Sequence, residues 1–416
     1  MKILWITNLL FPEAVSMIAE SSELRTTGGW MLGLADALVE QSDIYLSVAT
    51  VSHLVKSLTI VNGKNITYYI IPLGSGNYKY NKTYESYWKR IKTYVQPNVV
   101  HIHGTEFTHG LAYVNACGSE HVVVSIQGLK SAIAPYYYMG LSKKNIYKNL
   151  TFHDIIKGNI FKEQRDFYKT GKLEIEILSR VKHIMGRTSW DMAHVRAINP
   201  NATYHFCNEI LRKEFYDGSR WEYNKCMKHT IFLSQAGYPL KGLHQVIKAM
   251  PLILRYYPDT TIRIAGRDIT RNDGIWGLLH FTGYGKIIMR LIKKYNLENK
   301  ITFLGSLNAE QMKNEYLNCN IFVCPSSIEN SPNSLGEAQI LGVPCIASYV
   351  GGIPDMMQGN EEALYRFEEI EMLADKICNI FTCFSPNKNN IMMNNAKDRH
   401  NVNNNILQLI SIYRQL

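Results

Sequence analysis

Two glutamates, Glu329 and Glu337, lie close together in the segment PSSIENSPNSLGEAQILGVPCIAS, which spans residues 325–348. Most of the residues around the two acids are small or polar, and apolar runs flank the segment on both sides. Carboxylates accept hydrogen bonds, and hydroxyl-rich ligands such as sugars offer donors to them. The spacing therefore predicts a ligand site, if the flanking elements bring both carboxylates to one edge of a sheet.

The flanking pattern predicts those elements. An apolar strand ends at Pro325, a polar loop holds Glu329, and a helix is expected from Leu335 to Leu341. Asn333 and Ser334 are good N-cap residues for this helix, and Gly342 suits its end. Free backbone N–H groups at positions 334–336 would make an anion site suited to a diphosphate.

The two acids then have different expected roles. Glu337, one turn into the helix, can reach the two hydroxyls of a ribose, as acidic side chains do in dinucleotide-binding folds. Glu329, in the loop, can hydrogen-bond a sugar attached to the diphosphate. The plainer interpretation is that Glu337 only complements the helix dipole and that Glu329 is solvated.

Apolar runs alternate with helical patterns along the whole chain, which predicts two doubly wound parallel sheets in tandem. We expect an N-terminal domain (1–212, completed by a helix in 397–416) and a C-terminal domain (213–396), with 212–229 as linker and an Asn-rich loop after 386. Ligands bind beyond the carboxyl ends of parallel strands, so the site is expected in the cleft between the domains. The expected strands are 2–7, 44–50, 67–73, 99–104, 122–128, 183–188, 230–236, 261–266, 301–305, 321–326 and 344–348.

Composition excludes several classes of protein. No run of about 18 uncharged apolar residues occurs, so no membrane span is expected. The N-terminal KILWIT reads as a first strand in preference to a signal peptide. The eight cysteines form no C-x-x-C pair and read as buried free thiols in a reducing compartment, not as a metal site or a disulfide framework.

The net charge of +10 is concentrated in residues 79–182, which hold 16 Lys and Arg against 8 Asp and Glu. A basic surface attracts phosphate groups of nucleic acid, of an anionic membrane or of a substrate, or is simply solvated. Aromatic residues are interleaved there, which suits either a lipid-linked glycan at headgroup level or single-stranded nucleic acid. The lipid interpretation is preferred, and no nucleic acid partner is expected.

The segment PSSIENSPNSLGEAQILGVPCIASYVGGIPD resembles the donor-binding signature of retaining glycosyltransferases of family four, which have the GT-B fold of two facing Rossmann-like domains. The resemblance extends to TTGGWMLGLADAL (26–38), GYPLKGLHQVIKAM (237–250) and ITFLGSL (301–307). It implies a nucleotide-diphosphate sugar as donor, UDP in preference to GDP, with no cofactor and no metal. No Asp-x-Asp motif, which the other main glycosyltransferase fold uses to hold a metal, occurs.

Carried over by position, Lys241 is the expected diphosphate contact and Glu329 the sugar contact, both counted as catalytic. The family's usual arginine about five residues before this lysine is replaced by Gln235 or Ala236, for which Arg267 is a possible substitute. The expected donor-binding residues are Gly28, Gly29, Lys241, Asn333, Ser334, Leu335 and Glu337.

On the acceptor side, HGTEFTHG follows the strand at 99–103 and offers Glu106 and His109 as catalytic candidates. Relatives place a histidine or aspartate after the next strand, where this chain has Gln127, which can bind a hydroxyl but cannot act as an acid or base. His103, Arg187 and Glu209 can face the site or play structural roles, and Arg187 can pair with a nearby acid.

The resemblance implies a cytoplasmic enzyme, peripheral on the inner membrane face, that moves a hexose or related sugar to a glycan or lipid-linked acceptor. The Asn-, Ile-, Lys- and Tyr-rich composition suggests an AT-rich, bacterial genome. For a bacterial enzyme, the family resemblance implies assembly of a surface polysaccharide, such as capsule or lipopolysaccharide, on a lipid carrier. A sugar phosphorylase on the same fold remains open, as does a non-catalytic binder of anionic surfaces or nucleic acid.

Overall fold

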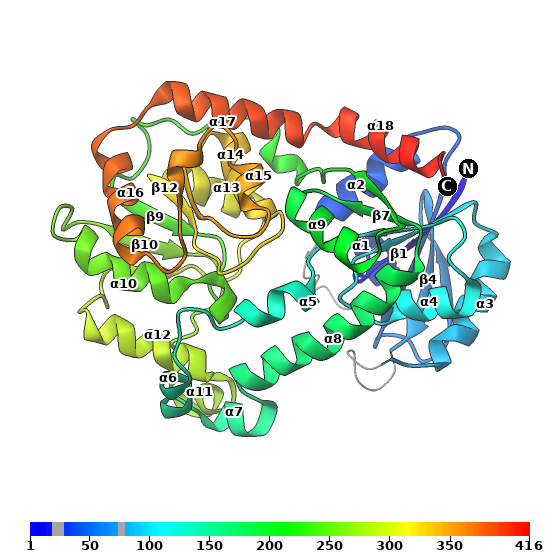
Figure 1. Cartoon of the computed structure of the whole chain (residues 1–416), viewed down its shortest axis with the longest axis horizontal. Coiled ribbons are helices and arrows are strands. Elements are labelled where there is room, and N and C mark those ends of the chain that lie inside the picture. Colours follow the sequence, from blue (N-terminus) through cyan, green and yellow to red (C-terminus); the bar gives the residue numbers. More distant parts are fainter. Residues whose placement is uncertain (19–28, 74–79) are drawn as a thin grey trace. The chain divides into compact units, whose positions relative to one another are not determined.

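The computed structural model describes residues 1–18, 29–73 and 80–416. Within them the chain forms two compact units (Figure 1). Unit 1 comprises residues 1–132, 166–212 and 400–416, and unit 2 comprises residues 133–165 and 213–399. Each unit is built around one twisted sheet covered by helices, which confirms the predicted α/β class.

Unit 1 holds an eight-stranded sheet in the order β3-β4-β2-β1-β5-β6-β7-β8. All neighbouring strands run parallel except the edge strand β3, which is antiparallel to β4. The order reverses between β1 and β5, so these strands form the topological switch point of the sheet. The strands are β1 (Lys2–Ile6), β2 (Tyr45–Ser52), β3 (Thr59–Asn62), β4 (Ile66–Pro72), β5 (Val99–His103), β6 (Val122–Ser125), β7 (His183–Gly186) and β8 (Thr203–Phe206).

Apolar side chains from alternate strand positions build a core on each face of this sheet. Trp5 lies in one core, with the helix α18, and Trp88 lies in the other. The helices of this unit are α1 (Pro12–Ile18), α2 (Gly29–Val39), α3 (Thr83–Val95), α4 (His109–Cys117), α9 (Ser189–Ile198) and α18 (Val402–Tyr413), while α5 (Lys130–Ile133) and α8 (Ile160–Arg180) connect it to unit 2.

The helix α18 belongs to unit 1 although residues 213–399 precede it in the chain. The Trp5 indole N–H donates to the Tyr413 hydroxyl at 2.9 Å, and His101 Nδ1 lies 2.6 Å from the same oxygen. All three groups are buried, so this polar contact is made inside the core. The two chain ends consequently lie near each other (Figure 1).

Unit 2 holds a six-stranded, fully parallel sheet in the order β11-β10-β9-β12-β13-β14. Its switch point lies between β9 and β12. The strands are β9 (Thr230–Leu233), β10 (Thr261–Ile264), β11 (Ile301–Phe303), β12 (Ile321–Cys324), β13 (Cys345–Ser348) and β14 (Leu364–Tyr365). The helices are α6 (Lys143–Lys148), α7 (Phe152–Lys157), α10 (Leu243–Ile253), α11 (Gly274–His280), α12 (Gly283–Lys294), α13 (Ala309–Asn318), α14 (Asn333–Leu341), α15 (Ile353–Met356), α16 (Ile370–Thr382) and α17 (Pro386–Arg399), with short 3₁₀ turns at Ala134–Tyr136, Lys213–Phe215, Pro239–Lys241 and Glu361–Ala363.

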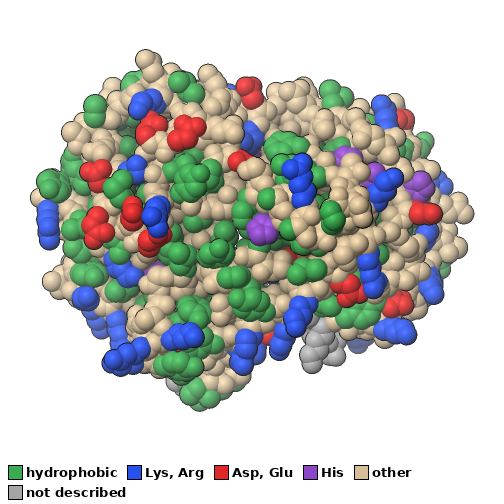
Figure 2. All heavy atoms as spheres, viewed as in Figure 1, with side chains coloured by type: hydrophobic (Ala, Val, Ile, Leu, Met, Phe, Trp, Pro, Cys, Tyr) green, Lys and Arg blue, Asp and Glu red, His purple; other side chains and the backbone are tan. Residues whose placement is uncertain are grey.

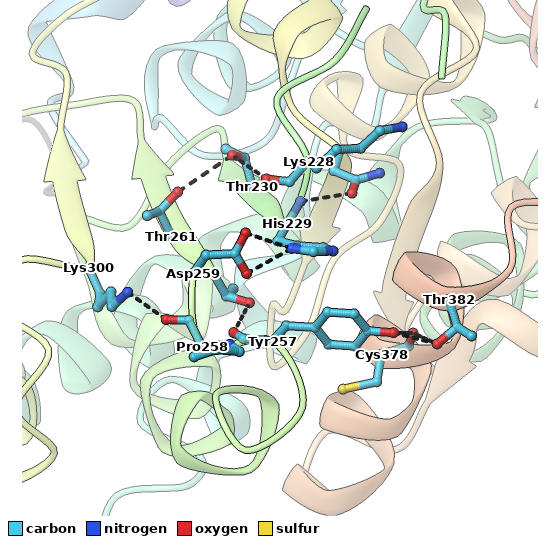
Figure 3. A network of polar contacts seen from close by, with 12 residues as sticks. Lys228, His229, Thr230, Tyr257, Pro258, Asp259, Thr261, Lys300, Cys378 and Thr382 are labelled. Atoms are coloured by element: carbon cyan, nitrogen blue, oxygen red, sulfur yellow. Dashed lines mark hydrogen bonds and ion pairs between the residues drawn. The ribbon is translucent and has the colours of Figure 1, made fainter. Parts of the chain in front are cut away.

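A polar network closes the amino-terminal edge of the unit 2 sheet (Figure 3). His229, just before β9, contacts both carboxylate oxygens of Asp259 at 2.8 and 2.9 Å. Lys300 donates to the carbonyl oxygen of Pro258 at 2.7 Å, and Tyr257 bonds to Thr382 of α16. The His–Asp pair lies at the sheet edge opposite to the ligand-binding edge, so its geometry indicates an anchor between loops.

Residues 133–165 pack with unit 2, whereas the sequence pattern predicts them in the N-terminal domain. Asp154 of α7 accepts a hydrogen bond from the Gly283 backbone N–H at 3.1 Å. Arg290 of α12 donates to Asn149 at 2.6 Å, and Lys286 donates to the Leu150 carbonyl oxygen at 3.2 Å. These contacts join segments more than a hundred residues apart, so local sequence patterns do not report them.

The Asn-rich segment after residue 386 is helical, not the predicted loop. Asn389 donates to the Gly342 carbonyl oxygen and Asn395 to that of Gln358, while Met392 and Ala396 are buried. These tertiary contacts outweigh the low helix propensity of asparagine. The edge strands β3, β8 and β14, which have four, four and two residues, were not predicted either.

All eight cysteines are free thiols, as expected. Five are buried, but Cys117 and Cys378 are partly exposed and Cys383 is exposed, so the expectation of burial holds for only part of the set. Among the described residues, no helix is both long enough and apolar enough to span a bilayer.

Two glycines allow the loops at the carboxyl edge of the unit 2 sheet to touch. Gly242 has φ +70°, and a Cβ there would overlap the carbonyl oxygen of Pro325. Gly351 has φ +53°, and a Cβ there would overlap the carbonyl oxygen of Glu329, which accepts from the Gly352 N–H at 3.0 Å. The loops after β9, β12 and β13 are therefore packed backbone against backbone.

Replacing Gly351 with alanine should lower the melting temperature of unit 2 by about 3–8 °C, because the side chain needs both a strained φ and a displaced loop. Differential scanning calorimetry measures the change. The matched control is Gly237→Ala, since a Cβ at Gly237 meets nothing within 4 Å and its φ is unrestricted. Equal melting temperatures for the two variants would show that the close approach does not constrain the loop.

Candidate functional site

The switch point of unit 2 brings together the two residues expected to carry the chemistry. Lys241 lies in the loop after β9 and Glu329 in the loop after β12, and these two strands are neighbours in the sheet. Ligands bind at such a crevice in open parallel sheets because the loops on either side diverge there. The two residues are 88 positions apart in the sequence, and they meet because their strands are neighbours in the sheet.

Lys241 and Glu329 form an ion pair, with 2.6 Å between Nζ and Oε1. The side chains are 20% and 17% exposed, so both charges are largely removed from water. Ser326 donates to the same carboxylate oxygen at 2.8 Å. Burial lowers the pKa of Lys241, but the carboxylate of Glu329 raises it more, so the pKa lies above its usual value and the ammonium stays charged.

The helix α14 begins at Asn333, and its N-cap is Pro332, with no side chain capping the first turn. The prediction that Asn333 or Ser334 is the N-cap is therefore wrong. Of the backbone N–H groups expected to be free, those of Leu335 and Gly336 bond to the Pro332 carbonyl oxygen, at 3.0 and 3.4 Å. The helix starts two residues earlier than predicted because Pro332 already fixes a backbone suited to precede it.

Glu337 lies within α14 and is only 4% exposed. Tyr316 of α13 holds the start of the same helix by donating to the Ser334 carbonyl oxygen at 2.9 Å. Because so little of the Glu337 side chain is exposed, a ligand can contact only a small part of it. The ribose-binding role of Glu337 stays a prediction.

A cavity of about 430 Å³ lies beyond the carboxyl ends of β10 and β11. Arg267 and Asp268 line it on the β10 side, and Gly305 and Ser306 line it on the β11 side. Gln235, where the family arginine was expected, is exposed, and Ala236 is buried. Arg267, the possible substitute for that arginine, follows β10, which is a neighbour of β9. It lines a cavity large enough for a nucleobase.

The switch point of unit 1 brings Asn8, after β1, next to Glu106, after β5. The Asn8 amide donates to the His103 carbonyl oxygen at 3.1 Å and to the Glu106 carboxylate at 3.4 Å. Burial raises the pKa of Glu106 to about 7, although nearby Lys130 and Arg187 lower it. Glu106 is therefore a carboxyl group that can change protonation state near neutral pH.

A second buried acid, Glu174 of α8, supports this corner of unit 1. It is fully buried and accepts from Thr105 at 2.8 Å, from the Lys130 N–H at 3.0 Å, and from the backbone and hydroxyl of Ser131 at 3.0 and 2.6 Å. Lys130 in turn donates to the Glu106 carbonyl oxygen at 2.9 Å. Glu174 fixes the loops on both sides of Glu106.

His109 does not share this environment. It is 4% exposed, its Nε2 lies 3.1 Å from the Thr7 carbonyl oxygen, and its ring stacks on Trp88. Burial lowers the pKa of His109 to about 4, so the neutral ring donates to that carbonyl. These contacts favour a role in holding β1 against α4, and the catalytic role of His109 stays a prediction.

The remaining candidates of unit 1 converge on a small cavity of about 30 Å³ lined by His103, Gln127, Arg187 and Glu209. Arg187 and Glu209 form a buried ion pair at 2.6 Å, which is the pairing that the sequence left open. Arg187 also donates to the carbonyl oxygens of Ile126 and Gln127, both at 3.1 Å. The cluster holds the ends of β6 and β7 together.

Of the two glycines expected to approach the ligand, Gly28 lies outside the described residues. Gly29 is the first residue of α2, and a Cβ there would lie 3.0 Å from the Arg212 side chain. Four polar residues of these sites were not predicted. Asn8 could have been found from its position directly after the first strand, but Lys130, Glu174 and Ser326 carry no local signal.

Metal coordination has no candidate ligand set in the described part of the chain, where no three His, Cys, Asp or Glu side chains gather closely enough.

The chain is similar in sequence to a known protein family and to individual known proteins. Residues 219–399 match the family model described as "Glycosyl transferases group 1". Over 224 residues, 53% of the chain, it is 25% identical to the phosphatidylinositol N-acetylglucosaminyltransferase gpi3 subunit of Schizosaccharomyces pombe. Over 109 residues, 26% of the chain, it is 33% identical to Protein CapJ of Staphylococcus aureus. These matches span 45% and 27% of the two relatives.

The fold is similar to that of Anabaena HepE, solved in complex with UDP, with a TM-score of 0.64 and 15% identity over 100% of both chains. Residues 219–399, which contain Lys241, Glu329 and α14, thus match the glycosyl transferases group 1 model, and the chain has the GT-B fold.

Proposed function

We propose that the chain is a retaining glycosyltransferase that moves a hexose or related sugar from a nucleotide-diphosphate sugar to a glycan or lipid-linked acceptor. The observation that carries the proposal is the Lys241–Glu329 ion pair at the switch point of unit 2, just before the helix α14. The pair combines a fixed cation for a phosphate with a fixed acceptor for a sugar hydroxyl.

Lys241 has three N–H donors, of which the bond to Glu329 uses one. The other two are available for oxygens of the donor diphosphate. Together with the N-terminus of α14, the ammonium stabilises the negative charge that grows on the diphosphate as it leaves. Glu329 keeps one carboxylate oxygen for a hydroxyl of the transferred sugar, since Lys241 and Ser326 share the other.

In the proposed reaction, the bond between the anomeric carbon and the diphosphate oxygen breaks first, which leaves an oxocarbenium-like centre. The acceptor hydroxyl bonds to the same face of that carbon, and its proton passes to an oxygen of the leaving diphosphate. The configuration is retained, and the step uses no enzyme nucleophile and no metal. The buried setting of the ion pair supports this charge-stabilising role.

UDP is the proposed nucleotide, which is supported by the UDP complex of the structurally similar HepE. The name of the Schizosaccharomyces pombe relative contains the phospholipid phosphatidylinositol, which supports a lipid-linked acceptor here. We place the reaction in the assembly of a bacterial surface polysaccharide. On the acceptor side, Glu106 and Asn8 are the proposed contacts for the acceptor hydroxyl.

Replacing Lys241 with alanine should lower kcat/KM for sugar transfer about 100-fold or more, because the leaving diphosphate loses its fixed cation and Glu329 loses its partner. Initial rates with a UDP-sugar and the acceptor measure this. Arg255→Ala removes an exposed charge from the same unit and should keep the wild-type rate. Release of sugar-1-phosphate that requires inorganic phosphate would instead establish a phosphorylase.

UDP at about 100 times its dissociation constant should stabilise the wild type by about 2.7 kcal/mol. Glu337→Ala should lose much of this gain if its carboxylate binds the ribose. Thermal shift against UDP, GDP, ADP and CMP measures both the choice of base and the role of Glu337. Equal shifts for the variant and the wild type would remove Glu337 from the site.

The raised pKa of Glu106 makes folding stability depend on pH. The contribution of its protonated form is complete below about pH 4.5 and is lost as the pH rises to about 7. Relative to Glu106→Gln, whose side chain stays neutral, the wild type should therefore lose about 1–3 kcal/mol across this window. Thermal unfolding of both proteins from pH 4 to 8 tests this, and parallel curves would contradict the raised pKa.

A further inference from the structure

The short helix α7 presents its apolar side chains to solvent and its acid to the interior. Ile155 and Ile156 are 77% and 60% exposed, and Phe152 is 46% exposed. Asp154, in contrast, is 7% exposed and accepts from the Gly283 N–H. Thr151 and Asp154 form a capping box, so the helix is held in this orientation by its own cap as well as by α12.

The neighbouring helix α6 extends the same surface. Ile146 of α6 is buried, but Tyr147 is 62% exposed and Lys148 is exposed beside it. Arg290 of α12 fixes the end of α6 through Asn149. We call the six exposed residues Tyr147, Lys148, Phe152, Ile155, Ile156 and Lys157 the α6–α7 patch. Its apolar side chains all lie within residues 147–156, and hydrogen bonds to α12 hold both helices in place.

The charge around the patch is positive. Residues 143–165 hold six Lys and Arg and only two acids, Asp154 and Glu163. Asp154 is buried, and Glu163 accepts a hydrogen bond from Tyr137 at 3.1 Å. Lys293 and Lys294 of the adjoining α12 are also exposed. Figure 2 shows hydrophobic and Lys or Arg side chains together at the lower left, where Figure 1 places α6, α7 and α12.

We propose that the α6–α7 patch docks on an anionic phospholipid surface. Aliphatic and aromatic side chains that project from a short helix can enter the headgroup region, and surrounding lysines are attracted to anionic lipids. A nucleic acid fits less well, because isoleucine lacks the flat face on which bases stack. The complementarity of a basic rim to an anionic bilayer distinguishes this surface from an ordinary apolar patch on a folded protein.

The proposal rests on the patch alone and does not depend on sugar transfer. Flotation with vesicles of phosphatidylcholine, with and without phosphatidylglycerol, tests it on the full chain. The wild type should float with the anionic vesicles and not with the neutral ones. The double variant Ile155→Ser/Ile156→Ser should partition at least about tenfold more weakly, since it removes the apolar contacts without changing the charge.

Ile391→Ser is the matched control, because Ile391 is an equally aliphatic, 50% exposed residue of α17 in the same unit. It should float like the wild type. Lys148→Ala/Lys157→Ala should weaken binding most at low salt, since screening reduces the attraction of exposed lysines. Thermal unfolding of every variant should match the wild type, as all these side chains are exposed.

The proposal would be overturned by a wild type that floats with neither kind of vesicle, by serine variants that float as well as the wild type, or by vesicle binding that single-stranded RNA displaces through the same residues. Binding that Ile391→Ser weakens equally would show a general apolar effect and would also reject the α6–α7 patch.

Discussion

The desolvated ion pair between Lys241 and Glu329 is the interaction on which the carboxyl edge of unit 2 depends. Two charges withdrawn from water are tolerated only when they are paired and hydrogen-bonded, and Ser326 completes the pairing. The loops that carry the pair also meet at backbone distance, where Gly242 lies against the Pro325 carbonyl oxygen and Gly351 against that of Glu329. Electrostatics and backbone sterics therefore specify the same arrangement, and a change in either disturbs both.

The switch point of unit 1 also holds a partly buried acidic residue, but its electrostatic environment differs from that of unit 2. Its switch point holds a carboxyl group with a raised pKa instead of an ion pair, and Glu174 carries the structural part by accepting four hydrogen bonds. One buried acid is thus saturated with donors, while Glu106, a few residues from Thr105, has fewer partners. Glu174 therefore has a structural role, whereas Glu106 is the acid that can change its protonation state near neutral pH.

Sequence reasoning found what local patterns encode. The buried strands and the loops that follow them were predicted from apolar runs. The family resemblance assigned Lys241 and Glu329 to one donor site, but their ion pair was found only in the structure. Sequence reasoning missed what depends on distant contacts. The α17 helix is held by amides of Asn389 and Asn395, and Glu174 looks like a solvent-facing residue of an amphipathic helix. The N-cap of α14 was misplaced because two cap-forming residues follow Pro332 directly.

The distribution of the two units along the chain also affects how the protein is made. Residues 133–165 leave the ribosome before any of residues 213–399, against which they pack, and β1 acquires its Tyr413 partner only after all of unit 2 has been synthesised. Domains usually fold one after another during synthesis, starting from the N-terminus. Here neither unit has its full set of partners until the other is largely complete. The nascent chain consequently carries the buried side chains of residues 133–165, such as Ile146, and the apolar face of β1 without their final support, which makes it a natural client for chaperones that shield such surfaces.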